Sequence, residues 1–265
     1  MRSSIIALIT DFGTEDGYVG AMKGRILTLN PSARIVDISH EIPPFDVRSG
    51  AFCLFNSYAY FPEGTIFVVV VDPGVGTRRR GLVLLSDRHV FIGPDNGVFS
   101  LILKEERVQA FRIREEQLPG EISPTFHGRD VFAPLAAWKG AGQSIATYLE
   151  PVGNPESFWE DPKELDAGKW QLRVLHIDHF GNIILNLRRK DLPASGANIP
   201  RKLEGKDFVI QRYLKTFGEA GEGELAMMWD SSGFLQIARN QGHAAETLGA
   251  RVGDPVILTL GASSK

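Results

Sequence analysis

The chain has 265 residues, 43% of them hydrophobic, and a formal net charge of −3. This length allows one large domain or two modest ones with a real core, and the weak negative charge gives no footprint for nucleic-acid binding. The single cysteine, Cys53, excludes an intramolecular disulfide framework and is expected to be a core residue in a reducing compartment. The first apolar run is too short for a signal peptide or a membrane span, so the sequence predicts a soluble cytoplasmic protein without a membrane partner.

Strand-like and helix-like segments alternate in the first half of the chain. Continuous apolar runs favour strands, and apolar residues at helical spacing favour helices. The expected strands are residues 4–10, 33–39, 65–71, 81–86, 89–93 and 108–113, and the expected helices are 17–30, 46–61, 97–106 and 129–142. This order predicts an α/β domain over residues 1–160, built on a parallel sheet that is covered on both faces.

Residues 150–169 are rich in Pro, Gly and charge, which is typical of a linker. Beyond them the pattern changes to short strands separated by turn residues. The expected strands are 170–178, 182–187, 206–211, 223–229, 233–239 and 254–260. The sequence therefore predicts an all-β domain over residues 170–265, either a small barrel or a sandwich.

Polar residues follow the strand runs of the first domain directly. They are Asp11, Ser39–His40, Asp72 and Asp95–Asn96. Ligands of open parallel sheets bind outside the carboxyl ends of the strands, so these residues are the first candidates for a site. Each one alone could equally form a turn, and Asp16 could equally cap the helix that follows it.

The loop "VDPGVGTRRRG" has two glycines but does not match a phosphate-binding motif. Asp72 just before the glycines would repel a phosphate. A carboxylate at a strand end and Arg79 seven residues later instead predict an ion pair that reaches into a pocket; a purely structural salt bridge is the alternative. Arg78 and Arg80 are expected to be solvated.

The segment "SPTFHGRDVF" brings a histidine to the start of a helix. Asp130 is a plausible N-cap of that helix, which leaves His127 on the approach loop. His127 could be merely hydrogen-bonded in place, but its neighbours Phe126 and Gly128 favour a shaped pocket wall.

The second domain offers two turns with binding character. Asp178, Phe180 and Asn182 combine an aromatic face with an amide, a way to hold a purine, and Ser231–Ser232 could hold a carboxylate. A metal site is the rival interpretation, because two groups contain His and Asp: His176, Asp178 and His179, and the strand-end set Asp11, Asp16 and His40. No H-x-x-x-H pair or cysteine set strengthens it, so we predict no metal.

Seven blocks in order resemble the SAM hydroxide adenosyltransferase family. They are "ITDFGTEDGYVGAMKG", "ISHEIPPFDVRSGAF", "FPEGTIFVVVVDPGVGTRR", "IGPDNGVFS", "TFHGRDVFAPLAA", "IDHFGNIILN" and "SSGFLQIARNQGHAA". The resemblance implies an N-terminal Rossmann-like α/β domain, a smaller C-terminal β-barrel, and a homotrimer whose active sites lie at subunit interfaces. It also implies hydrolysis of S-adenosyl-L-methionine (SAM) to adenosine and L-methionine, with SAM as substrate and no cofactor.

The resemblance also assigns expected roles to individual residues. The water-activating set falls on Asp72, Arg79 and His127. The remaining positions match substrate-binding groups: Asp11 for the ribose diol, Asp16 and Asp178 for the ammonium group, Ser231 and Ser232 for the carboxylate, Phe45 beside the sugar, and Phe180, Asn182, Arg239 and Gln241 for adenine.

Halogenating relatives carry aromatic residues in place of the aspartate and histidine of this set, and a serine where this chain has Gly128. The retained Asp72 and His127 therefore favour water over halide as the nucleophile. Three alternatives stay open: a non-catalytic SAM or adenosine sensor, a halide-dependent adenosyl transferase, and a metal-dependent phosphoesterase.

Overall fold

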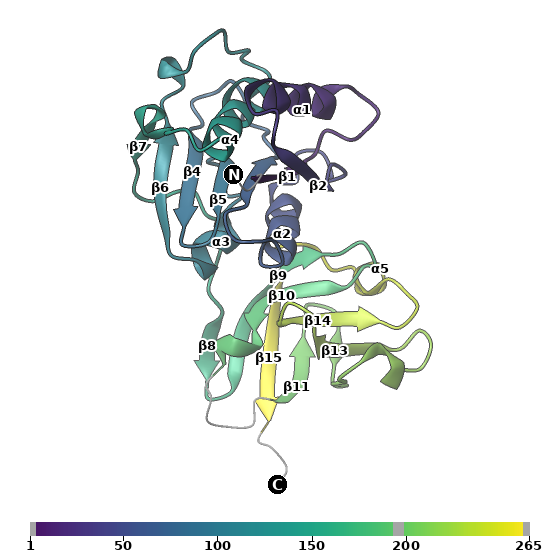
Figure 1. Cartoon of the computed structure of the whole chain (residues 1–265). Coiled ribbons are helices and arrows are strands. Elements are labelled where there is room, and N and C mark those ends of the chain that lie inside the picture. The colour runs from purple at the N-terminus through teal and green to yellow at the C-terminus, as the bar shows by residue number, and fades with distance from the viewer. Residues whose placement is uncertain (1–3, 193–198, 262–265) are drawn as a thin grey trace. The chain divides into compact units, whose positions relative to one another are not determined.

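The structure is a computed structural model that describes residues 4–192 and 199–261. The chain divides into two compact units, Met1–Trp159 and Glu160–Lys265, and each is described by itself (Figure 1). No helix among the described residues is long and apolar enough to cross a membrane.

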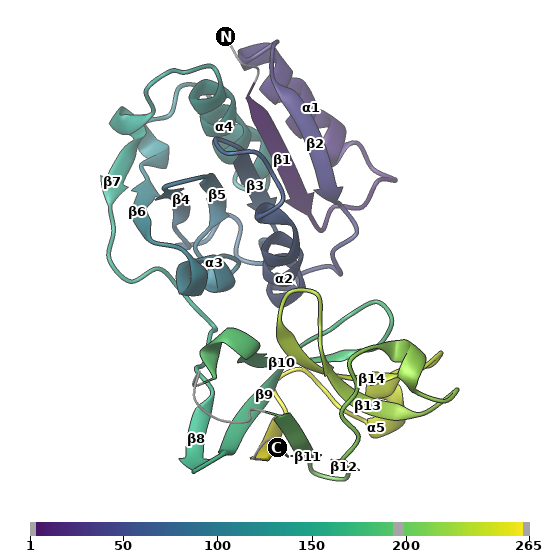
Figure 2. The ribbon, with the colours of Figure 1, turned by 60° about the horizontal axis from the view of Figure 1, so that its bottom comes forward.

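The N-terminal unit is built on a seven-stranded sheet with the order β2-β1-β3-β5-β4-β6-β7. Its strands are β1 (Ile5–Thr10), β2 (Arg34–Ser39), β3 (Ile66–Val70), β4 (Gly81–Ser86), β5 (Val90–Pro94), β6 (Val108–Ile113) and β7 (Leu149–Pro151). The first four strands in this order are parallel, as Figure 2 shows for β1 and β2, and the others are antiparallel. The expectation of an α/β unit is confirmed, and the expected parallel sheet is found for β2, β1, β3 and β5 but not for the other three strands.

The change from parallel to antiparallel strands occurs at one tight turn, between β4 and β5. Ser86 donates its N–H to the carbonyl of His89 at 3.0 Å, so β4 and β5 form a hairpin. A parallel pair would need a crossover of a dozen residues or more, and three residues separate these strands.

Helices cover both faces of this sheet. On one face α1 (Tyr18–Leu29) and α4 (Ala133–Gly140) pack on alternate residues of β1 and β3, among them Leu8 and Val68. The intervening residue Phe67 points to the other face, since side chains alternate along a strand. There it stacks on Phe91, beside α2 (Val47–Tyr58) and α3 (Ser100–Glu105).

The helix expected over residues 129–142 begins differently from the prediction. A π-helical turn, Gly128–Phe132, precedes α4, and His127 occupies the position before the turn. Asp130 is therefore not an N-cap. It accepts the N–H of Ser123 at 3.0 Å and both Nε and Nη2 of Arg129 at 2.7 Å, and these Arg129 bonds hold the pKa of Asp130 below its usual value.

Five short 3-10 or α-helical turns complete the helices of the described residues. They are Glu115–Gln117, Ala146–Tyr148, Arg189–Asp191, Phe217–Glu219 and α5 (Ala244–Leu248). Cys53 lies half-buried on α2, and burial raises the pKa of its thiol to about 11, which suits the expected core role.

The C-terminal unit is an antiparallel sheet that curls until its ends approach each other (Figure 2). Its strands are β8 (Lys163–Asp166), β9 (Lys169–Ile177), β10 (Ile183–Arg188), β11 (Ile199–Glu204), β12 (Val209–Ile210), β13 (Leu225–Trp229), β14 (Phe234–Arg239) and β15 (Pro255–Gly261). The end strands are β12 and β13, and Tyr213, just after β12, bridges to Met227 of β13. The sheet is thus nearly closed and barrel-like, and it encloses a core that includes Leu185 and Leu258.

Two features of this half differ from the sequence-based expectation. The strand β11 carries one proline, Pro200, and three charged residues, and it was not expected. The stretch 150–169 was expected to be a linker, but part of it forms strands. It contains the end of β7, which pairs with β6, and all of β8, which pairs with β9. The part of the expected second domain that covers residues 193–198 and 262–265 lies outside the described residues.

Candidate active site

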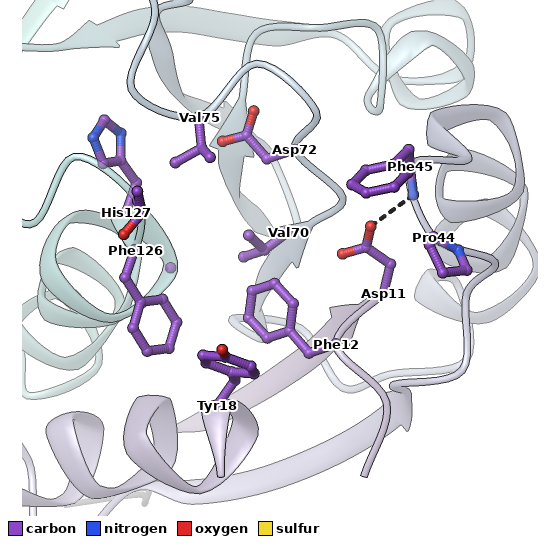
Figure 3. A pocket seen from close by; sticks show the side chains of 12 residues that line it. Asp11, Phe12, Tyr18, Pro44, Phe45, Val70, Asp72, Val75, Phe126 and His127 are labelled. Carbon is purple, nitrogen blue, oxygen red and sulfur yellow. Dashed lines mark hydrogen bonds between the residues drawn. The ribbon is translucent and has the colours of Figure 1, made fainter. Parts of the chain in front are cut away.

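A cavity of about 430 Å³ opens at the carboxyl ends of the parallel strands in the N-terminal unit (Figure 3). Asp11 follows β1, and Asp72 follows β3 after one residue, so the register of the sheet brings both to this edge. The lining residues are Asp11, Phe12, Tyr18, Pro44, Phe45, Val70, Asp72, Val75, Thr125, Phe126, His127 and Gly128.

Asp72, Arg79 and His127 meet in one buried cluster. The Nε of Arg79 lies 3.1 Å from Oδ1 of Asp72 and its Nη2 lies 2.5 Å from Oδ2, a bidentate ion pair. The same Nη2 lies 2.9 Å from Nδ1 of His127. All three side chains are less than a tenth exposed.

This geometry fixes the hydrogen-bond roles of His127. A guanidinium group only donates, so Nδ1 of His127 accepts the Arg79 hydrogen bond. The neutral ring then carries its proton on Nε2. Arg79 is not among the residues that line the cavity, whereas Asp72 and His127 are, so Arg79 holds its two partners from behind.

Glu115 is a further charged group at this cluster, and no motif in the sequence indicates it. Its Oε1 lies 3.6 Å from Nδ1 of His127 and 3.8 Å from Nη1 of Arg79. That Nη1 is buried and has no hydrogen-bond partner among the described residues. The only sequence signal is the position of Glu115 two residues after the expected strand 108–113, which is too common to single it out.

The Asp72 loop folds against the His127 loop because of one glycine. Gly76 has φ +74°, and a Cβ atom there would stand 2.4 Å from the carbonyl oxygen of Pro124. A side chain at this position would push the two loops apart. The other end of the loop is held by Asn96, whose Nδ2 donates to the carbonyl of Val71 at 2.8 Å.

Asp11 is oriented by the backbone of Phe45. The N–H of Phe45 donates to Oδ2 of Asp11 at 2.8 Å, drawn as a dashed line in Figure 3. Phe45 has φ +67°, a left-handed conformation that costs a bulky residue energy, and its side chain is 70% exposed. Because the Phe45 side chain is mostly exposed, packing does not explain its strained backbone. Backbone strain at a residue that lines a cavity instead indicates a functional role.

Three aromatic rings form one wall of the cavity. Phe12, Tyr18 and Phe126 contact one another edge to face, with ring centroids 5.5–6.0 Å apart. The guanidinium of Arg129 lies 4.9 Å from the centroid of Phe126. An aromatic wall beside carboxylates suits a ligand that is both cationic and partly apolar.

The neighbours of Arg79 differ from each other. Arg78 is exposed, as expected. Arg80 was also expected to be solvated, and its side chain is 36% exposed, but it pairs with the buried carboxylate of Asp95. The other oxygen of Asp95 accepts the N–H of Glu156 at 2.7 Å. Asp95 directly follows β5, so its hydrogen bond with Glu156 links the last residues of the N-terminal unit to the sheet.

Asp16 lies outside the set that lines the cavity. It is exposed and does not cap α1, whose N-cap is Gly17 with no side-chain hydrogen bond. Its predicted role at the ammonium group stays a prediction.

In the C-terminal unit, Asp178 builds the turn between β9 and β10. Its Oδ1 accepts the N–H groups of Phe180 and Asn182 at 3.0 and 2.9 Å, and its Oδ2 accepts the Asn182 side-chain amide at 2.8 Å. The turn leaves the ring of Phe180 73% exposed. Asp178 and Asn182 thus stabilise the turn, and the aromatic ring of Phe180 is exposed to solvent.

Arg239 and Gln241 lie at the same end of the barrel strands as this turn, because Ile183 of β10 pairs with Ile237 of β14. Arg239 donates to the carbonyl of Gly223 and to Oγ1 of Thr247, and Gln241 has φ +52°.

The Ser231–Ser232 turn lies at the other end of β14. Phe234, just after it, pairs with Arg188 at the far end of β10 from Asn182. The carboxylate of Asp230 already accepts the N–H of Ser232 at 2.8 Å, and burial raises the pKa of Asp230. Within one chain the structure therefore does not bring the two predicted binding turns together.

The rival metal interpretation is not supported by clustering. Among residues 4–192 and 199–261, no three His, Cys, Asp or Glu side chains are grouped as a metal ion would require. In the set of Asp11, Asp16 and His40, the ring of His40 contacts Thr10 and Asp37 with its two nitrogens.

Comparison with known proteins gives the family. The family model described as the SAM hydroxide adenosyltransferase N-terminal domain matches residues 6–148, and the model of its C-terminal domain matches residues 172–257. Proteins named (R)-S-adenosyl-L-methionine hydrolase from Salinispora tropica and Thermus thermophilus are 37% and 38% identical, over 97% and 96% of this chain and 98% of each relative.

Two further matches extend this result. A protein named fluorinase from Actinoplanes sp. is 28% identical, over 96% of this chain and 97% of its own. A crystal structure of a conserved protein from Thermotoga maritima has a TM-score of 0.83 and 34% identity, over 96% of this chain and 99% of that one. Both domain models and the near full-length relatives lead to the same conclusion: the chain belongs to the SAM hydroxide adenosyltransferase family.

Proposed function

We propose that this protein is an enzyme that hydrolyses SAM to adenosine and L-methionine. The observation that carries the proposal is the buried cluster of Asp72, Arg79 and His127, two members of which line the cavity at the sheet edge. The hydrolase names of relatives at 37% and 38% identity support it.

The reaction needs a nucleophile more than an acid. Water attacks the ribose 5′-carbon in line with the C–S bond, the new C–O bond forms, and the electrons of the C–S bond stay on sulfur. Because the sulfur leaves as a neutral thioether, no general acid is required. The protein must hold the water roughly 3–3.5 Å from carbon and remove one of its protons.

Asp72 is the group that accepts this proton. His127 is not available as acceptor in the described arrangement, because its Nδ1 accepts from Arg79 and its Nε2 carries a proton. An Nε2–H group can instead donate to the developing hydroxide. Arg79 holds both groups in place through its bidentate bond to Asp72 and its bond to His127.

The remaining residues of the cavity would bind the adenosyl part. Asp11, oriented by the Phe45 N–H, offers its Oδ1 to a ribose diol, and Phe45 lies beside it. In the C-terminal unit, the exposed ring of Phe180 supports stacking on adenine, near Asn182, Arg239 and Gln241. The roles of Asp16 and Asp178 at the ammonium group and of Ser231 and Ser232 at the carboxylate rest on the resemblance alone.

The test is incubation of the purified protein with SAM in EDTA, followed by chromatography for adenosine. Because the relatives' name specifies the (R) form, both sulfonium diastereomers are used separately. Adenosine well above the blank is expected. Tight SAM binding without adenosine would favour a sensor, 5′-halo-adenosine formed only with halide would favour a transferase, and loss of all activity with EDTA would favour a metal enzyme.

We also propose, from the resemblance, a cytoplasmic homotrimer that uses no metal or cofactor. A trimer in solution would have about three times the 29.2 kDa mass of one chain, which light scattering after size-exclusion chromatography measures directly. Each active site would lie between the N-terminal unit of one chain and the C-terminal unit of its neighbour. Mixing inactive Asp72→Ala and Phe180→Ala proteins would then restore part of the activity; no recovery after subunit exchange would count against shared sites.

We further propose that the N-terminal unit is Rossmann-like. Its parallel strands β2, β1, β3 and β5, covered by helices on both faces, support this. The antiparallel strands β4, β6 and β7 extend the sheet beyond that pattern.

A further inference from the structure

A chain of polar contacts runs behind the Asp11 loop and is not part of the Asp72 cluster. It links α1, β2 and β1 through Lys23, Asp37, His40 and Thr10. Thr10 and His40 are buried, at 0% and 5% exposure, and neither lines the cavity. Buried polar groups are costly unless paired, so a chain of polar contacts at this position calls for a reason.

The donor and the acceptor of each contact can be assigned by starting from Lys23, the charged end of the chain of contacts. Lys23 Nζ lies 2.6 Å from Oδ2 of Asp37, and Oδ1 of Asp37 lies 3.0 Å from Nε2 of His40. Although partial burial acts to raise it, the pKa of Asp37 is lowered by these two partners, so Asp37 is an ionised acceptor. Nε2 of His40 faces this carboxylate at ion-pair distance, although the contact lacks hydrogen-bond geometry. Of the two tautomers of the neutral ring, the one protonated at Nε2 turns a donor toward Asp37 and leaves Nδ1 as an acceptor.

The acceptor nitrogen of His40 determines how the Thr10 hydroxyl is turned. Oγ1 of Thr10 lies 2.9 Å from Nδ1 of His40 and gives its only proton to that nitrogen. Its lone pairs then face the N–H of Phe12, which donates to Oγ1 at 3.2 Å. The N–H of Gly13 in turn donates to the carbonyl of His40 at 2.8 Å.

These bonds fix the backbone on both sides of Asp11. Thr10 precedes it and Phe12 follows it, and a hydroxyl bond from one to the other closes a short turn around Asp11. Oδ2 of Asp11 is held from the opposite side by the N–H of Phe45. Asp11 is thus positioned in two independent ways. The Phe45 N–H binds its carboxylate directly, and the Thr10 hydroxyl, held by His40, fixes its backbone.

We propose that His40 is a positioning residue of the active site: through Thr10 it holds Asp11 in the orientation that receives a ribose diol. The inference rests on the proposed function, because it assigns Asp11 to the ribose. His40 does not touch the substrate. Its effect appears as selectivity for ligands that carry ribose hydroxyls.

The experiment measures the affinity of the full-length protein for adenosine and for 2′-deoxyadenosine by calorimetry. A hydroxyl bound to a carboxylate predicts about 10-fold or more tighter binding of adenosine to the wild-type protein. Thr10→Val keeps the side-chain shape but removes the hydroxyl, and should reduce this ratio to about 3-fold or less. Thr10→Ser restores the hydroxyl and should restore most of the ratio.

His40→Gln should reduce the ratio in the same way and raise the KM for SAM more than it lowers kcat. The matched control is His89→Gln in the same unit, since His89 is equally buried but lies among the rings of Tyr58, Phe67 and Phe91. It should change thermal stability but not the adenosine ratio. Asp37→Ala, at a side chain that is 42% exposed, gives a variant that should fold even where His40→Gln does not, and it should lower the ratio partly.

The outcomes separate this inference from the proposed function. If wild-type protein discriminates the two nucleosides and Thr10→Val discriminates them equally well, the positioning role is wrong while the hydrolase function stands. An equal loss of affinity for both nucleosides would also overturn it, because it would show a merely structural role. If the wild-type protein neither forms adenosine from SAM nor binds adenosine, the proposed function itself fails.

Discussion

Arg79 uses three of its N–H groups on two partners, and this makes Asp72, Arg79 and His127 a single unit. Residues that act as one unit have non-additive effects when they are replaced. A lysine at position 79 would keep the charge but could not hold Asp72 with two parallel bonds and reach His127 as well.

We expect Asp72→Asn to lower kcat about 100-fold or more while adenosine binding changes little, because it removes the proton acceptor and retains the shape. Arg79→Lys should lower kcat by a similar order. The double variant should be little worse than either single one. Steady-state SAM turnover measures all three, with exposed Arg78→Lys as the matched control; losses that simply multiply in the double variant would contradict a single unit.

Sequence reasoning identified these three residues because each stands in a compact motif. It missed Glu115, although its Oε1 lies 3.6 Å from His127, because nothing in the chain order indicates that residues 115 and 127 meet. It also missed the ion pair of Arg80, since the partner, Asp95, is fifteen positions away and follows another strand. Local patterns name candidate groups; tertiary packing decides which of them are partners.

At the scale of elements, the His127 loop is tied to the helix that follows it. Asp130 accepts the N–H of Ser123, four residues before His127, and is paired with Arg129. The Arg129 hydrogen bonds are the main cause of the lowered pKa of Asp130. A lowered folded-state pKa means that the ionised form stabilises the fold, at any pH above the pKa that the group has in the unfolded chain.

Asp130→Asn should therefore lower the melting temperature near pH 7, and the difference from wild type should shrink as the pH falls below about 4. The check is a set of thermal melts of both proteins from pH 7 to pH 3. A difference that stayed constant over this range would show that the charge of Asp130 is not what stabilises the loop.

The elements that the sequence predicted well are those with a strong local pattern. The apolar run of β3 and the helical spacing of α1 are examples. The parallel sheet was over-predicted because strand direction depends on the connection, and the short turn before His89 makes β4 and β5 antiparallel. β11 was missed because an irregularity in its pairing between Pro200 and Lys202 places its buried residues, Pro200 and Leu203, three positions apart instead of two.

At the scale of the whole molecule, each of the two units has a core of its own. One gathers residues of β1, β3, α1 and α4, and the other lies inside the barrel-like sheet. Each unit buries its own apolar side chains, so each has the means to unfold as its own cooperative unit.

We expect Leu185→Ala, at a fully buried barrel position, to destabilise the C-terminal unit by about 2–5 kcal/mol. Hydrogen exchange read by mass spectrometry should show faster exchange in β9, β10 and β14 and unchanged protection in β1 and β3. Leu135→Ala on α4, equally buried, is the reciprocal control and should affect only the N-terminal unit. Loss of protection in both units from either variant would indicate one cooperative structure.

The left-handed backbone of Phe45 has a consequence for how this protein can evolve. A large side chain held in water on a strained backbone costs stability of about 1 kcal/mol or more, and selection for stability alone would remove it. Phe45→Asn, which tolerates this conformation, should therefore raise the melting temperature while weakening adenosine binding. Laboratory selection for heat resistance, without selection for activity, should therefore replace Phe45 early. The residues that are replaced first would identify surface positions that are retained for ligand binding and not for stability.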